Sequence, residues 1–192
     1  MKPVERIEIV DYATYEDRRN AFRAEVMKAK DARRVHVGEH LTFLFENHLT
    51  VRYQIQEMMR AERLVREADI VHEIDTYNEL LGKDGELGCT LLIEIDDPHL
   101  RDRKLRDWVA LPGKVYALLE AGTRIHATAD ERQRDQVRLS AVQYLKFNTR
   151  GLVPLAIGID LPDLRNETRL SDATRQVLRS DLQLEKAGSM EV

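Results

Sequence analysis

The sequence predicts an α+β fold, in which helices pack on one face of a largely antiparallel sheet. One observation is that apolar residues recur at helical spacing through much of the first half of the chain. Another is that apolar residues alternate in short segments of the second half. Short turns join these segments, and connections of that length allow antiparallel but not parallel pairing. We therefore expect a helix-rich N-terminal half and a β-rich second half.

Three helices are expected in the first half, over about residues 14–33, 51–67 and 70–81. Thr14 stands three residues before Asp17, as the N-cap of a capping box does. Thr50 has the position of a cap for the second helix. Between the first two helices, residues 35–46 alternate between apolar and polar, so they are expected to form one extended segment.

The second half is expected to hold five strands, over about residues 87–95, 115–120, 123–129, 140–147 and 155–159. Ala121-Gly122 would join the second and third of these as a hairpin. Asp97-Pro98 predicts the start of a short helix that ends near Val109. A weak amphipathic helix is expected over about residues 171–184, either without fixed structure or packed on a partner subunit.

The composition fits one compact domain with a well-solvated surface. Of the 192 residues, 43% are hydrophobic and 33% are charged. We predict a single domain over residues 1–165 and a polar C-terminal tail over residues 166–192. The net charge of −4 argues against a nucleic-acid partner.

The cysteine count and the apolar patterning exclude several classes of protein. A single cysteine, Cys89, excludes an intrachain disulfide, a cysteine-based zinc site and a four-cysteine iron–sulfur cluster within this chain. No apolar stretch approaches the roughly 20 residues that span a bilayer. The first ten residues do not resemble a secretory signal. We therefore expect a cytoplasmic protein with no membrane partner, and we expect Cys89 to be a core residue.

His36, His40 and Glu46 form the first candidate metal site, on the polar face of the expected extended segment. In a straight strand the two histidines would lie ~13 Å apart, too far to share one metal ion. A sharp bend at Gly38 would bring them together. The alternative is a solvated or hydrogen-bonded strand face.

Glu62 is a second candidate, for metal binding or proton transfer. It falls in the middle of the apolar face of the helix expected over residues 51–67. A carboxylate buried there would need a partner or a raised pKa, and Arg66 is the nearest cation in sequence. The alternative is a structural ion pair or hydrogen-bond hub.

Another side of the same expected helix carries a candidate site for an anion or a partner protein. Its residues are Arg52, Tyr53, Gln56 and Arg60. Guanidinium groups fit carboxylates and phosphates, so the two arginines could hold an anion. The alternative is a charged, solvated helix face.

Five segments of the chain resemble a known family. They are RRVHVGEHLTFLFEN at 33–47, TVRYQIQEMMRAER at 50–63, EIDTYN at 73–78, SAVQYLKF at 140–147 and GID at 158–160. Together they resemble DUF3501, a family of uncharacterised bacterial proteins, over about residues 14–162. The resemblance implies no activity, cofactor or catalytic residue. It implies a rubrerythrin and an iron–sulfur protein as partners, because members are often encoded beside them.

These observations lead to three hypotheses of function. The first is a soluble accessory or binding protein that supports redox partners and carries no redox centre itself. The second is a metal-dependent enzyme built on His36, His40, Glu46 and Glu62. The third is a binding protein for a small anionic ligand held by Arg52 and Tyr53. The sequence leaves the metal, the cofactor, the reaction and the oligomeric state open, a homo-oligomer included.

Overall fold

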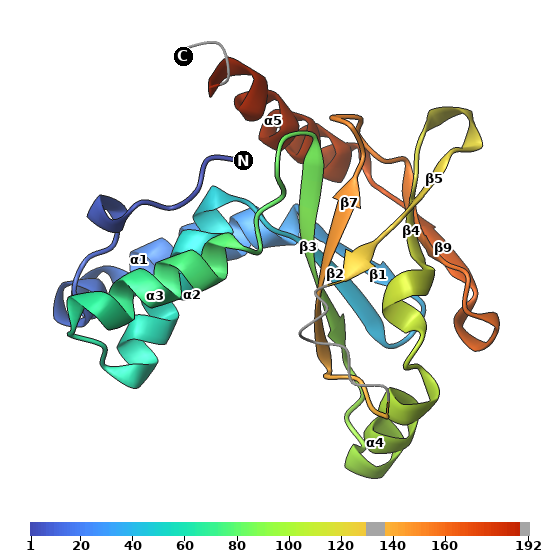
Figure 1. Cartoon of the computed structure of the whole chain (residues 1–192), viewed down its shortest axis with the longest axis horizontal. Helices are drawn as coiled ribbons and strands as arrows, with labels where there is room; N and C mark the ends of the chain where they lie inside the picture. Colours follow the sequence, from blue (N-terminus) through green and yellow to red (C-terminus); the bar gives the residue numbers. More distant parts are fainter. Residues whose placement is uncertain (130–136, 189–192) are drawn as a thin grey trace.

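The computed structural model describes residues 1–129 and 137–188, and it has the α+β architecture that the sequence predicts. Within these residues lie two antiparallel sheets, with strand orders β1-β2-β3-β7-β6 and β5-β4-β8-β9. Figure 1 shows α1, α2 and α3 on one side of the first sheet and the second sheet on its other side. The sequence predicted a single sheet. Instead, the strands pair in two separate groups, and the two resulting sheets pack face to face.

The helices begin and end close to their expected positions. They are α1 (Tyr12–Asp31), α2 (His48–Glu62), α3 (Glu67–Asn78), α4 (Pro98–Asp107) and α5 (Asp172–Gly188). The predicted N-caps of α1 and α2 were wrong, and each actual N-cap lies three residues earlier in the sequence. Asp11, not Thr14, caps α1, and its side chain accepts hydrogen bonds from the first turn. Asn47 caps α2, and Thr50 is its capping-box partner.

Helix α2 is shorter than predicted, since it ends at Glu62 instead of Glu67. Arg63 adopts the left-handed conformation, with φ of 51°, and closes the helix with a hydrogen bond from its amide to the Met59 carbonyl. Val65 therefore does not extend the apolar face of the helix and is 72% exposed.

The first sheet is built from a hairpin and two long strands. Its members are β1 (Arg34–Val37), β2 (Leu41–Phe45), β3 (Glu86–Ile93), β6 (Thr128–Ala129) and β7 (Val142–Asn148). The extended segment predicted over residues 35–46 is a hairpin that turns at Gly38, where φ is +67°. Val35 pairs with Phe43 and Val37 with Leu41, so the predicted apolar face is kept.

The second sheet contains β4 (Val115–Leu118), β5 (Arg124–His126), β8 (Ala156–Ile159) and β9 (Asn166–Arg169). The strand predicted over residues 123–129 is divided at Ala127, which is buried. Its first part, β5, pairs with β4, and its second part, β6, pairs with β7 of the other sheet. This segment therefore links the two sheets at one edge.

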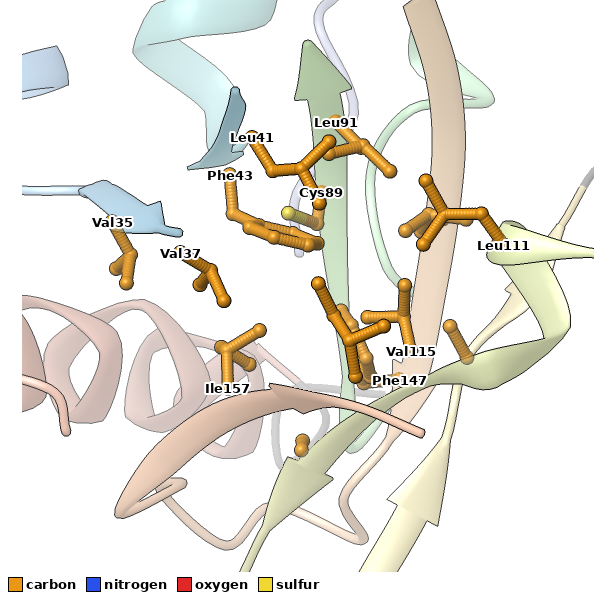
Figure 2. Packing of buried hydrophobic residues seen from close by; sticks show 14 of the residues in the cluster. Val35, Val37, Leu41, Phe43, Cys89, Leu91, Leu111, Val115, Phe147 and Ile157 are labelled. Atoms are coloured by element: carbon orange, nitrogen blue, oxygen red, sulfur yellow. The ribbon is translucent and has the colours of Figure 1, made fainter. Parts of the chain in front are cut away.

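The main core lies between the two sheets (Figure 2). Phe43 and Phe147 from the first sheet meet Val115 and Ile157 from the second. Cys89 belongs to this cluster and is 2% exposed, which confirms it as a core residue. Burial raises the pKa of its thiol well above the usual range, so the thiol stays protonated and unreactive. A separate apolar cluster holds α2, α3 and the N-terminal segment together.

Residues 166–182 belong to the folded domain, which corrects the predicted polar tail at 166–192 as far as the structure describes it; residues 189–192 of that tail lie outside the described residues. Strand β9 pairs with β8, and Leu178 and Leu182 of α5 are buried in the main core. The sequence NETR of β9 has no apolar side chain, so no alternation marks it as a strand. None of the helices in the described part of the chain is both long and apolar enough to cross a membrane.

A polar cluster fastens α1 to α2 around Glu57. Its carboxylate accepts a hydrogen bond of 2.6 Å from the Tyr15 hydroxyl and two of 2.7 and 2.8 Å from the Arg19 guanidinium. The hydrogen bonds from Arg19 are the main reason that the pKa of Glu57 is lowered. Charged Glu57 therefore contributes stability at neutral pH, and this contribution is lost as the pH falls through its lowered pKa.

We expect Glu57→Gln to lower the free energy of unfolding by about 1 kcal/mol at pH 7. The difference from wild type should shrink as the pH falls below 4.5, the ordinary pKa of a glutamate. Urea unfolding between pH 3 and 7 would measure it, with the exposed Glu25→Gln as the control. A difference that does not change with pH would contradict the assignment.

Candidate functional site

A cleft lies between the C-terminal end of α3 and strands β6 and β7. Its volume is about 610 Å³, within the range that small-molecule sites occupy. Tyr77 and Thr76 come from α3, Tyr144 and Lys146 from β7, and Lys83 from the loop after α3. The remaining lining residues are Glu79, Leu80, Thr128, Ala129 and Leu145. Residues far apart in sequence thus supply aromatic, cationic and hydroxyl groups to one concave surface.

Two half-buried tyrosines form the aromatic part of this cleft. Burial raises the pKa of the Tyr77 phenol, and a hydrogen bond with Gln54 partly opposes this change. Burial also raises the pKa of Tyr144, and the negative charge of Glu46 adds to the effect. Both phenols therefore stay protonated at neutral pH, and each places a hydroxyl beside an apolar ring.

The ammonium groups of Lys83 and Lys146 have no ion-pair or hydrogen-bond partner among residues 1–129 and 137–188. The backbone of Lys146 is held in the sheet, where it pairs with Gly88 on one side and Thr128 on the other. Lys83 is fixed through its backbone amide, which donates to the Glu86 carboxylate. Two cations are thus held at the cleft with their side chains able to meet an anion.

The Glu46 carboxylate is buried between the first sheet and α2, with only 7% of the residue exposed. It accepts hydrogen bonds of 2.6 Å from the Thr90 hydroxyl and 2.5 Å from the Thr50 hydroxyl. Its charge acts on Tyr144, so a negative group lies behind the aromatic wall of the cleft. Each oxygen of the Glu46 carboxylate therefore already accepts a hydrogen bond from a threonine of the fold.

Lys30 is a residue of interest that the sequence analysis missed. Its ammonium lies 5.1 Å from the centre of the Tyr53 ring, and burial lowers its pKa while Glu46 opposes that change. The signal in the sequence is its position four residues after Val26, on the inner stripe of α1. A lysine on an apolar stripe is a candidate for a perturbed pKa.

His36 lies in β1 and His40 lies in the turn that precedes β2, and the two rings have different neighbours. His36 Nδ1 lies 2.8 Å from the Thr42 hydroxyl, which donates its single proton to Glu94. His36 Nδ1 must therefore be the donor in this contact. His40 lies near the Trp108 ring, at 6.4 Å between ring centres.

The bend at Gly38 exists, yet it does not assemble the predicted metal site. Glu46 bonds to its two threonines at the far end of β2, away from both histidines. In the described part of the chain, no group of three or more His, Cys, Asp or Glu side chains could hold a metal ion. The four residues proposed for metal or proton transfer thus occupy separate places.

Glu62 is exposed, so the prediction that it is buried or lies at a contact was wrong. The physical reason is the early end of α2, because Glu62 is its last residue and the apolar face does not continue past it. Arg66 pairs with Asp69 at 3.6 Å instead of with Glu62.

The candidate anion site on α2 is covered by other parts of the chain. The Arg52 guanidinium stacks over the Phe22 ring of α1 at 4.7 Å, and Tyr53 is buried. The Gln56 side chain bonds both the amide and the carbonyl of Val10. Arg60 lies 3.5 Å from Glu16 of α1. These residues hold α1 and the N-terminal segment, and the cationic cleft lies elsewhere, beside α3.

Comparison with known proteins places the chain in a family. A family model described as a protein of unknown function, DUF3501, matches residues 3–182. A crystal structure of a novel protein of unknown function from Burkholderia pseudomallei K96243 is 30% identical, with a TM-score of 0.87. That match covers 94% of this chain and 100% of the other. No curated protein matches the chain. The chain therefore belongs to the DUF3501 family.

Proposed function

We propose that this protein binds a small anionic molecule in the cleft between α3 and β7. The observation that carries the proposal is that a space of about 610 Å³ is lined by two tyrosines and by two lysines whose ammonium groups have no partner in the described part of the chain. A few polar groups aimed into a partly apolar cleft are typical of small-ligand sites. The lysines would neutralise a carboxylate or phosphate, the Tyr77 phenol would donate a hydrogen bond to it, and the Tyr144 ring would form part of the wall.

This proposal keeps the ligand class of the third sequence hypothesis but moves the site from Arg52 and Tyr53 to Lys83 and Lys146. The geometry does not favour the metal-enzyme hypothesis, because no three or more His, Cys, Asp or Glu side chains of the described residues come together as metal ligands would. The rubrerythrin and iron–sulfur partners remain a prediction that rests on the family resemblance. Co-purification with either partner would be its test.

The double variant Lys83→Gln, Lys146→Gln is expected to bind its anion at least tenfold more weakly, since each charged contact contributes about 1–2 kcal/mol. A thermal-shift screen of small carboxylates and phosphates would find the strongest ligand, and calorimetry would give the Kd. Lys114→Gln, at the exposed end of the short 3-10 helix that precedes β4, is the matched control. If no anion raises the melting temperature, or if the double variant binds as wild type does, the proposal fails.

A further inference from the structure

A second cleft, of about 270 Å³, lies between α5 and the loop that joins β7 to β8. Arg175 and Arg179 line it from α5, and Leu152 and Val153 line it from the loop. Figure 1 shows α5 across one end of the two sheets. This cleft and the one beside α3 share no lining residue. Its lining combines two guanidinium groups with apolar side chains.

The two arginines differ from Asp181, another charged residue of α5, in their contacts. Asp181 faces inward and pairs with Arg33. Arg175 and Arg179 form no ion pair and no side-chain hydrogen bond with the described side chains of residues 1–129 and 137–183, although Glu120 lines the same cleft. The Nε of Arg175 is shut off from solvent and has no partner there. A buried donor without an acceptor is unfavourable, so the described part of the fold does not satisfy the Arg175 guanidinium.

The apolar wall of the cleft is open to solvent. Leu152 is 58% exposed, and Val153 beside it is half-buried. Arg175 and Arg179 lie one turn apart, so their backbone positions are separated by about 6 Å along the helix. Acidic side chains two residues apart on an extended chain are separated by about 6.6 Å, a close match.

We propose that this cleft binds an acidic segment of a partner protein, with two carboxylates on Arg175 and Arg179 and an apolar side chain against Leu152. The charge pattern favours carboxylates because guanidinium forks bind them with two parallel hydrogen bonds. The exposed leucine favours a peptide over a small inorganic anion, which would leave the apolar wall uncovered. The site is independent of the cleft beside α3.

The test is selection of random twelve-residue peptides, displayed on phage, against the immobilised full-length protein. We expect enriched peptides with two acidic residues near an apolar one. In fluorescence polarisation, the double variant Arg175→Gln, Arg179→Gln should bind them at least tenfold more weakly. Arg103→Gln, on the exposed face of α4, and the Lys83→Gln, Lys146→Gln variant should bind them as wild type does.

The double arginine variant should melt at or above the wild-type temperature, because its removed groups have no partners in the described part of the fold. The proposal is overturned if no peptide is enriched, or if enriched peptides lack acidic residues. It is also overturned if the arginine variant binds them equally well. If inorganic phosphate displaces the peptides and binds the cleft as tightly as they do, the cleft is a small-anion site and the proposed peptide site is overturned.

Discussion

Replacing Asp181 with asparagine is expected to lower the free energy of unfolding by about 3–5 kcal/mol. Asp181 Oδ2 and Oδ1 accept hydrogen bonds of 2.9 and 2.8 Å from the Nε and Nη2 atoms of Arg33. The two side chains are only 9% and 6% exposed, so the substitution leaves a buried guanidinium without its counter-charge. Urea denaturation, followed by circular dichroism, would measure the loss.

A surface pair provides the matched control for this experiment. Arg34 and Asp31 lie 3.1 Å apart, but their side chains are 36% and 70% exposed. Water screens such a pair, so Asp31→Asn should change the free energy of unfolding by less than about 1 kcal/mol. The double variant Arg33→Met, Asp181→Leu should recover most of the stability, because an apolar pair leaves no buried charge. A loss below 1 kcal/mol in Asp181→Asn would contradict this account.

The Arg33–Asp181 pair illustrates what sequence patterns do not reveal. The two residues are 148 positions apart, and no local periodicity connects them. Sequence alone therefore left residues 166–192 as a tail, whereas α5 is fastened to the end of α1 by a buried ion pair. Strand β9 was missed for a related reason, because edge pairing with β8 uses backbone groups and needs no apolar side chain.

Elements with local chemical signals were predicted well. Asp97-Pro98 begins α4, and the side chain of Asp97 caps its first turn as expected. The alternation in residues 87–95 became the central strand β3, because a strand buried on its inner face must place every second residue in the core. The sequence analysis expected a straight extended segment over residues 35–46, but it named Gly38 as the position for a bend, and the hairpin turns there.

The candidate site was the least predictable feature. Tyr77 and Tyr144 lie in two of the segments that carry the family resemblance, yet neither was selected as a cleft residue. The two tyrosines come together because the end of α3 lies beside β7, and sequence patterns do not reveal such a tertiary contact. The histidines drew attention by their chemistry, but geometry gives His36 and His40 different neighbours.

The approach of α3 to the sheet predicts a second large effect, at Gly88 of β3. A Cβ atom there would lie 1.9 Å from the Leu80 carbonyl oxygen and 3.1 Å from the Gly82 amide nitrogen. Both are backbone atoms, so the clash is not relieved by a side-chain rotation. We expect Gly88→Ala to lower the free energy of unfolding by about 3 kcal/mol or more, measured by urea denaturation.

Gly113→Ala is the matched control, since a Cβ atom there would have no neighbour within 4 Å. Gly113→Ala should leave the free energy of unfolding unchanged or raise it slightly, because alanine restricts the conformations of the unfolded chain. Gly88 also pairs with Lys146, and Leu80 lines the same cleft. Any Gly88→Ala protein that stays folded should therefore separate α3 from β7 and bind the anion more weakly. If the free energy of unfolding of Gly88→Ala lies within about 1 kcal/mol of the wild-type value, α3 is not held against the sheet. The cleft would then lose its structural basis.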